Sequence, residues 1–272
     1  MIMEKYDIII FMGQSNMQGQ SGATTNTDIV PNAYEYRFLT NKVKPLQTPV
    51  GEDIRYDMTE GFSYTDENQD EWRKITALGS ALDDCTNLIP EFCKNYTLIT
   101  GRKVVAVHAA KGATTISQWL PGSGGYFAVR EKVRACYNYL TSQNIGKKIV
   151  VWLQGESDAI EGVSTADYKS RLIRLKNELK KDLGIDKFAI IKVGSFTFDE
   201  RDSRIFDAQE EVCKEDGDFI MLTRIADSLI HKKEYVYVWG HYNAKAQEII
   251  GRIAGSNLGS YEMGLPFIDD TI

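Results

Sequence analysis

Five short apolar runs rich in β-branched residues alternate along this chain with longer segments in which apolar residues recur every three or four positions. The runs predict strands at Asp7–Phe11, Lys103–His108, Lys148–Leu153, Phe188–Val193 and Phe219–Leu222. The periodic segments predict helices near Ser80–Tyr96, Tyr126–Ser142, Thr165–Leu183, Arg201–Glu215 and Asn243–Leu258. This alternation is typical of a parallel sheet with helices on both faces. We therefore expect an α/β fold with a doubly wound, mainly parallel sheet of five strands.

One stretch, at about residues 20–76, breaks this alternation. It is rich in Thr, Asn, Asp, Pro and Tyr and shows only short strand signals such as Tyr34–Leu39. Long irregular segments in compact domains often form binding loops, although a segment without a function fits the pattern equally well. The chain shows no internal repeat, low-complexity tract or interdomain linker. We predict a single domain over residues 1–272 with a loop-rich insertion at about 20–76.

Net charge, hydropathy and cysteine spacing limit the partners and the cellular compartment that we expect for this protein. The net charge of −6 argues against nucleic acid and against an anionic membrane surface. No apolar run approaches the roughly 20 residues of a transmembrane helix, and no basic leader precedes the first strand. The four cysteines lack C-x-x-C spacing, which favours reduced thiols. We expect a cytoplasmic protein without a nucleic-acid or membrane partner.

The first candidate for chemistry follows the first predicted strand, which stops at Gly13-Gln14-Ser15-Asn16-Met17. A glycine allows a sharp turn because it has no Cβ. Open α/β sheets bind their ligands at the carboxyl ends of the strands. A serine at this point is placed to act as a nucleophile, whereas capping a short helix is its commoner structural use.

A second apolar strand ends in the same way, at Gln154-Gly155-Glu156-Ser157-Asp158. If the sheet is parallel, Glu156 leaves it at the same edge as Ser15. An acidic residue there can orient a histidine or simply cap the following helix.

Only three histidines are present, and a serine hydrolase needs a base that titrates near neutrality. His231 lies in a Lys-rich turn, which we set aside. His108 ends a strand, where a hydrogen-bonded core histidine is the commoner finding. His241 follows Gly240 and opens the last predicted helix, so it is the preferred base. Gly79 stands at a helix start, where a free N–H can stabilise an oxyanion.

In this order, the blocks Gly-Gln-Ser-Asn-Met, Gly79, Gln-Gly-Glu-Ser-Asp and His241 resemble the motifs of the SGNH hydrolases. More narrowly, they resemble carbohydrate esterase family six and the sialic-acid acetylesterase domain, and the likeness spans nearly the whole chain. The resemblance implies a three-layer α/β/α sandwich of flavodoxin-like topology with a serine-esterase site on one edge of the sheet.

The resemblance also implies roles for individual residues. Ser15 becomes the nucleophile and His241 the general base, while the backbone N–H groups of Ser15 and Gly79 stabilise the oxyanion. The family's usual third donor is an Asn in Gly-x-Asn-Asp, where this chain has Gly-Glu-Ser-Asp. Gln154 is the favoured substitute and Ser157 the alternative.

The acid of the triad is a second departure from the family pattern. Many SGNH hydrolases carry an Asp three residues before the His, and here Val238 occupies that position. The Gln-Gly-Glu branch of the family uses its Glu, so Glu156 inherits the role, with Asp227 and Asp158 as possible substitutes. If no acid serves, a backbone carbonyl can hold the imidazole of His241, which gives a dyad.

The resemblance implies a Ser-His-Glu esterase that removes O-acetyl groups from carbohydrates through an acetyl-enzyme, without a metal or an organic cofactor. Acetylated xylo-oligosaccharides and O-acetyl sialic acids are the candidate substrates. Gln14, Asn16 and Trp119 are weaker candidates for contacting the sugar. The alternative is a non-catalytic carbohydrate-binding protein on a degenerate esterase scaffold, which the missing acid at Val238 suggests.

Overall fold

A seven-stranded sheet forms the centre of the computed structural model, which describes residues 5–51, 85–141 and 144–268. From one edge to the other, the strands are β3 (Lys42–Pro45), β2 (Ala33–Arg37), β4 (Lys103–Ala110), β1 (Tyr6–Gly13), β5 (Ile145–Leu153), β6 (Lys187–Ile191) and β7 (Phe219–Thr223). Within this sheet, as described, only the pair β2–β3 is antiparallel. The predicted mainly parallel sheet is confirmed.

The prediction of five strands was wrong, because the hairpin β2–β3 extends the sheet beyond β4. Both strands lie inside the segment that we expected to be irregular, and β2 pairs with β4 in parallel. The strand signal at Tyr34–Leu39 corresponds to β2. The partner strand β3 gave little signal because it consists of four residues, Lys-Val-Lys-Pro, at an edge of the sheet with no buried position.

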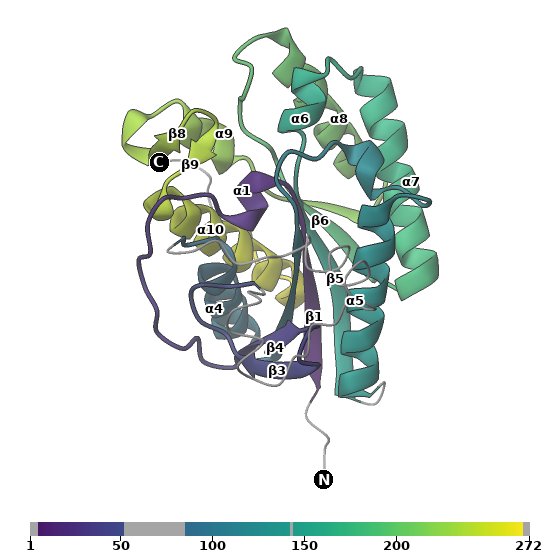
Figure 1. The fold of residues 1–272 in the computed structure, drawn as a ribbon, viewed down its shortest axis with the longest axis vertical. Helices are drawn as coiled ribbons and strands as arrows, with labels where there is room; N and C mark the ends of the chain where they lie inside the picture. Colours follow the sequence, from purple (N-terminus) through teal and green to yellow (C-terminus); the bar gives the residue numbers. More distant parts are fainter. Residues whose placement is uncertain (1–4, 52–84, 142–143, 269–272) are drawn as a thin grey trace, which may run out of the picture.

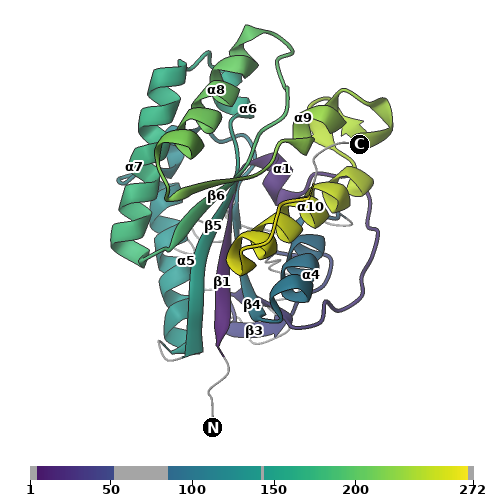
Figure 2. The ribbon, with the colours of Figure 1, turned by 180° about the vertical axis from the view of Figure 1, so that it is seen from behind.

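Helices cover both faces of the sheet (Figure 1, Figure 2). One face carries α5 (Gly124–Leu140), α7 (Thr165–Leu183) and α8 (Glu200–Glu215), and the other carries α4 (Ile89–Thr100), α9 (Ile225–Ile230) and α10 (Ala244–Met263). Side chains alternate along β1, so that Ile8, Ile10 and Met12 enter the first core and Ile9 and Phe11 the second. The predicted three-layer sandwich is thus confirmed.

The predicted helices agree with the observed ones apart from their ends. The bounds of α7 match the prediction, whereas α4 begins only at Ile89, with a proline in its first turn. The start predicted at Ser80 lies outside the described residues. Helix α10 continues past Leu258 to Met263 and ends at Gly264, which has φ 65°. No helix within the described ranges is long and apolar enough to cross a membrane.

Short elements gather where the central strands end. They are α1 (Ser15–Gln18) after β1, the 3-10 helix η1 (Ile116–Trp119) after β4, and α6 (Glu156–Ile160) after β5. The 3-10 helix η3 (Lys233–Tyr235) and a hairpin of β8 (Val236–Val238) and β9 (His241–Tyr242) precede α10. Figure 1 shows α1, α6 and this hairpin near the end of the sheet that lies away from the N-terminus. The candidate catalytic residues belong to these elements.

Candidate active site

The turn that follows β1 places Ser15. Gly13 pairs with Leu153 of β5 and has φ 151°, and a Cβ on it would lie 2.0 Å from the Leu153 carbonyl oxygen. Only glycine fits such a position, because a side chain would separate the two strands at their ends. The chain therefore turns sharply after β1, and Ser15 becomes the first residue of α1.

Ser15 is nearly buried, and its polar groups are available for a ligand. In the described part of the chain, neither its hydroxyl nor its backbone N–H takes part in a hydrogen bond. The turn after β4 passes beside it, since a Cβ on Gly112 would lie 3.5 Å from the Ser15 Cβ. A nucleophile and one oxyanion donor can therefore come from the same residue.

His241 is held by a backbone carbonyl. Its Nδ1 lies 3.1 Å from the carbonyl oxygen of Trp239, across the turn at Gly240 of the β8–β9 hairpin. Because a carbonyl only accepts hydrogen bonds, Nδ1 carries the proton and Nε2 keeps its lone pair. Partial burial lowers the pKa of the imidazole from its ordinary value of 6.5, and the bond to Trp239 opposes this shift. The ring is thus kept in the tautomer that a general base requires.

Asn16 joins the Ser15 helix to the His241 hairpin. Its side-chain amide donates to the carbonyl of Gly240 at 2.9 Å, and its side-chain oxygen accepts from the N–H of Tyr242 at 3.3 Å. These two residues flank His241 in the chain. The structure therefore brings together the segments of Ser15 and His241, although no hydrogen bond between these two side chains occurs among the described residues.

No hydrogen bond joins Glu156 to the imidazole in the described part of the chain. It is 2% exposed, and its Oε1 accepts a hydrogen bond from Asn16 Nδ2 at 2.8 Å, while Oε2 has no partner in the described chain. Burial raises the pKa of the carboxyl group from 4.5 to about 7. The expectation that Glu156 hydrogen-bonds to His241 is not met. Oε1 of Glu156 accepts from Asn16, and the Nδ1–H of His241 is donated to the Trp239 carbonyl.

The two substitute acids make no hydrogen bond to His241 among the described residues either. Asp158 accepts from Gln154 and from the N–H of Ile116, at 2.6 and 2.9 Å. Asp227 accepts from the N–H and the hydroxyl of Ser195, at 2.8 and 2.7 Å. Of the possibilities raised by the sequence, the backbone carbonyl is the one that the geometry of the described residues fits.

Gln154 does not fit the predicted role of oxyanion donor. It is fully buried, and its side-chain nitrogen donates to the Thr114 carbonyl at 2.8 Å and to Asp158 at 2.6 Å. The side-chain oxygen of Gln14, at 3.2 Å, is a third acceptor, and an amide has only two hydrogens, so both are already used. Gln154 instead connects the end of β5 to the turn after β4. Ser157, the alternative donor, uses its backbone N–H to bond Gln14 at 3.2 Å. Gly79 lies outside the described residues.

The predicted sugar contacts are interior residues. Gln14 is 3% exposed, and its side-chain oxygen accepts from Gln154 and Ser157. Trp119 is 1% exposed, donates its indole N–H to the Thr114 hydroxyl at 3.1 Å, and packs edge-on against a second tryptophan of the core. Asn16 is equally buried. All three side chains are thus buried, and the hydrogen bonds described for them go to other residues of the protein.

An exposed aromatic surface beside His241 escaped the sequence analysis. Trp239 is 67% exposed, and the centroid of its ring lies 4.9 Å from that of Phe196. The Phe196 ring also meets the His241 imidazole edge-on. The tryptophan stands in the Tyr-Val-Trp-Gly stretch before His241, and an apolar residue next to a glycine turn was the available signal. The indole offers a flat face beside the base.

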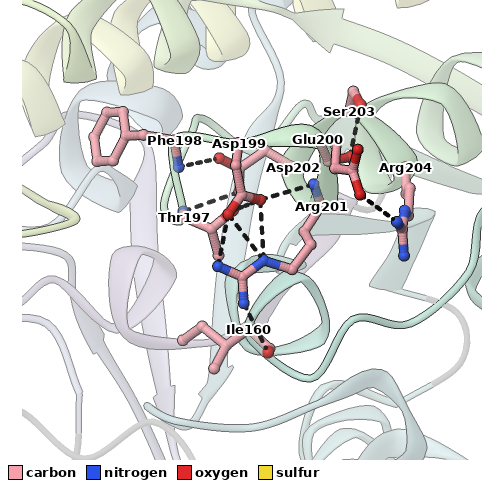
Figure 3. Close-up of polar contacts among 9 residues, drawn as sticks. All are labelled: Ile160, Thr197, Phe198, Asp199, Glu200, Arg201, Asp202, Ser203 and Arg204. Carbon is pink, nitrogen blue, oxygen red and sulfur yellow. Dashed lines mark hydrogen bonds and ion pairs between the residues drawn. The ribbon is translucent and has the colours of Figure 1, made fainter.

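The loop that follows Phe196 is held by hydrogen bonds to the first turn of α8 (Figure 3). The carboxylate of Asp202 accepts from the backbone N–H groups of Thr197 and Phe198, at 3.1 and 2.7 Å. Asp199 pairs with Arg201, which reaches the carbonyl of Ile160 at the end of α6 at 3.4 Å. These contacts hold the loop between β6 and α8 to the first turn of α8 and to the end of α6.

Comparison with known proteins identifies the family. A family model described as "Carbohydrate esterase, sialic acid-specific acetylesterase" matches residues 5–258. The chain belongs to this family. Among curated proteins, a probable carbohydrate esterase from Arabidopsis thaliana is similar to this esterase. The two are 24% identical over 196 residues, which cover 68% of this chain and 67% of the plant protein.

Solved structures share the fold of this esterase. A crystal structure of an Arabidopsis thaliana protein matches with a TM-score of 0.68 at 16% identity, over 94% of this chain and 98% of the other. A carbohydrate acetylesterase from Xanthomonas citri matches with a TM-score of 0.53 at 13% identity, over 95% of this chain and 56% of the other. The family model and these folds confirm the resemblance that the motifs indicated.

Proposed function

We propose that this protein is a serine esterase that removes O-acetyl groups from carbohydrates, with Ser15 as the nucleophile and His241 as the general base. The observation that carries the proposal is the imidazole of His241. A backbone carbonyl fixes its Nδ1, and Asn16 ties its hairpin to the helix of Ser15. Family membership supports an ester hydrolase that acts on acetylated carbohydrates.

The geometry supports a two-step mechanism. The Ser15 hydroxyl attacks the acetyl carbonyl while Nε2 of His241 takes its proton, and the oxyanion accepts from the Ser15 N–H and, as the family resemblance implies, from Gly79. His241 then protonates the departing sugar oxygen, and the acetyl-enzyme forms. Water hydrolyses this ester by the reverse sequence of proton transfers. The Trp239 carbonyl takes the orienting role that a carboxylate has in a triad, so Val238 is no obstacle to catalysis.

The exposed ring of Trp239 is the surface on which we propose that the sugar rests. It lies two residues before the base in the chain, and it packs against Phe196, whose ring meets the His241 imidazole edge-on. Aromatic faces bind apolar faces of ligands while polar groups around them set the orientation. Acetylated xylo-oligosaccharides and O-acetyl sialic acids remain the candidate substrates.

Acetate release from a panel of acetylated xylo-oligosaccharides and O-acetyl sialic acids tests the function and names the sugar. Ser15→Ala is the matched control, and we expect it to reduce turnover on the order of a thousandfold or more. A fluorophosphonate should label the wild type at Ser15 and leave the variant unlabelled. Binding of sugars without labelling or acetate release would favour the non-catalytic alternative.

A further inference from the structure

Every polar atom of the Asn16 side chain is engaged between three elements. The nitrogen Nδ2 donates to Glu156 Oε1 of α6 at 2.8 Å and to the Gly240 carbonyl at 2.9 Å. The oxygen Oδ1 accepts from the N–H of Tyr242 at 3.3 Å. Two acceptors face the nitrogen and one donor faces the oxygen, which sets the orientation of the amide. Asn16 therefore acts as a clamp on the backbone on either side of His241.

Glu156 stands at the other end of this clamp, and its own environment is unfavourable. The carboxyl group is almost completely buried, and among the described residues it accepts one side-chain hydrogen bond, from Asn16. Its second oxygen, Oε2, is buried without a partner. Burial raises the pKa of this carboxyl group although Asn16 and the backbone N–H groups of Gly155 and Glu156 bond to it, so these hydrogen bonds do not offset the free-energy cost of burying the acid. An apolar residue would pack there at lower cost, so the contact with Asn16 is what distinguishes Glu156 from such a residue.

We propose that Glu156 is a positioning residue that acts on His241 through Asn16. Its Oε1 holds the Asn16 amide, which in turn holds the carbonyl of Gly240 and the N–H of Tyr242. Without Glu156, one Asn16 hydrogen loses its acceptor, and the amide is free to rotate away from the hairpin. The imidazole then shifts relative to Ser15. This inference rests on the proposed function, because it assigns His241 the role of base.

Glutamine at position 156 separates this role from that of a triad acid. Glu156→Gln keeps an acceptor oxygen for Asn16 but carries no negative charge, so kcat on p-nitrophenyl acetate should stay within about threefold of the wild type. Glu156→Ala removes the acceptor, and a displaced base should reduce kcat on the order of a hundredfold with KM little changed. Equal losses in the two variants, both folded by thermal unfolding, would overturn the proposal.

A double-mutant cycle with Asn16→Ala tests whether Glu156 acts through Asn16. The two alanine variants should show similar losses of kcat, and the double variant should be no worse than either, because both break the same contact. Losses that multiply would show that Glu156 acts independently, and the proposal would fail. Asp158→Asn is the matched control: it changes a carboxyl of the same helix that bonds Gln154 and not Asn16, so its effect should multiply with that of Asn16→Ala.

The two proposals fail in different ways. If the wild type releases no acetate and takes no fluorophosphonate label, the proposed function is wrong. If the wild type is active and folded Glu156→Gln is as impaired as Asn16→Ala, only the positioning role is wrong. Should Glu156→Ala not fold, Asn16→Ala replaces it in the comparison because it breaks the same hydrogen bond. Full activity of Asn16→Ala would also contradict the positioning role.

Discussion

Under the proposed function, with His241 as the general base, the pKa of His241 sets the pH range in which the enzyme works. Partial burial lowers it from 6.5, so the imidazole is neutral at pH 7 and able to accept the Ser15 proton. Because the neutral ring is the active form, kcat/KM should be constant around pH 7 and fall as the pH drops through a midpoint below 6.5. Hydrolysis of p-nitrophenyl acetate between pH 4.5 and 8 measures this midpoint.

A midpoint above 6.5 would contradict the assignment, because it would require an ionised carboxylate next to the imidazole. Glu156→Gln is the control for this measurement. Since Glu156 bonds Asn16 and not His241, the midpoint of the variant should equal that of the wild type.

Residue types alone show which side chains can react but not which partners already occupy them. The motif predicted that Ser15 lies just past the first strand, and the structure places it at the start of α1, two residues after the end of β1. Gln154 was a suitable oxyanion donor by its chemistry, yet acceptors on Thr114, Asp158 and Gln14 share its two hydrogens. The orienting group for His241 is a backbone carbonyl, which every residue possesses, so no side chain marks it in the sequence.

At the scale of elements, the β8–β9 hairpin carries His241, the proposed base, and determines its position. Gly240 has φ 72°, and a Cβ on it would lie 2.0 Å from the Phe196 ring. Gly240→Ala should therefore displace the turn, destabilise the fold by about 1–3 kcal/mol and reduce kcat at least about tenfold, because the Trp239 carbonyl and His241 move with it. Thermal unfolding and hydrolysis of p-nitrophenyl acetate measure the two effects.

Gly217→Ala provides the matched control for the hairpin variant. A Cβ on Gly217 meets no atom within 4 Å, so this substitution should change neither the stability nor kcat appreciably. If Gly240→Ala behaves like Gly217→Ala, the hairpin tolerates displacement and does not position the base.

The exposed indole of Trp239 lies in the turn of the same hairpin. Replacing it tests whether the sugar packs on this ring. Trp239→Ala removes the ring but keeps the backbone carbonyl that holds His241. For acetylated oligosaccharides KM should rise about tenfold, while kcat/KM for the small p-nitrophenyl acetate should change much less, since it lacks a sugar to pack on the ring. Equal losses on both substrates would assign Trp239 to the catalytic geometry alone.

Periodicity predicted the larger elements because each buries a wide apolar face. Helix α7 repeats Leu at three- and four-residue spacing, and its bounds were predicted correctly. Strand β3 has no buried residue, so its place in the sheet depends on pairing with β2 and leaves no hydrophobic pattern. Edge strands of this kind are determined by their neighbours more than by their own residues.

For the molecule as a whole, Glu156 makes stability depend on pH. Its pKa is near 4.5 in an unfolded chain and about 7 in the folded protein. Between these values the folded state binds more protons, so the free energy of unfolding falls as pH rises through this window.

Glu156→Gln removes the effect, so its free energy of unfolding relative to wild type should rise between pH 4 and pH 8 by roughly 3 kcal/mol. Asp158, whose pKa burial raises to about 6, acts in the same direction in both proteins and largely cancels in the difference. Urea unfolding of both proteins at the two pH values measures it, and a difference that does not change with pH would show that the Glu156 carboxyl titrates normally in the folded protein.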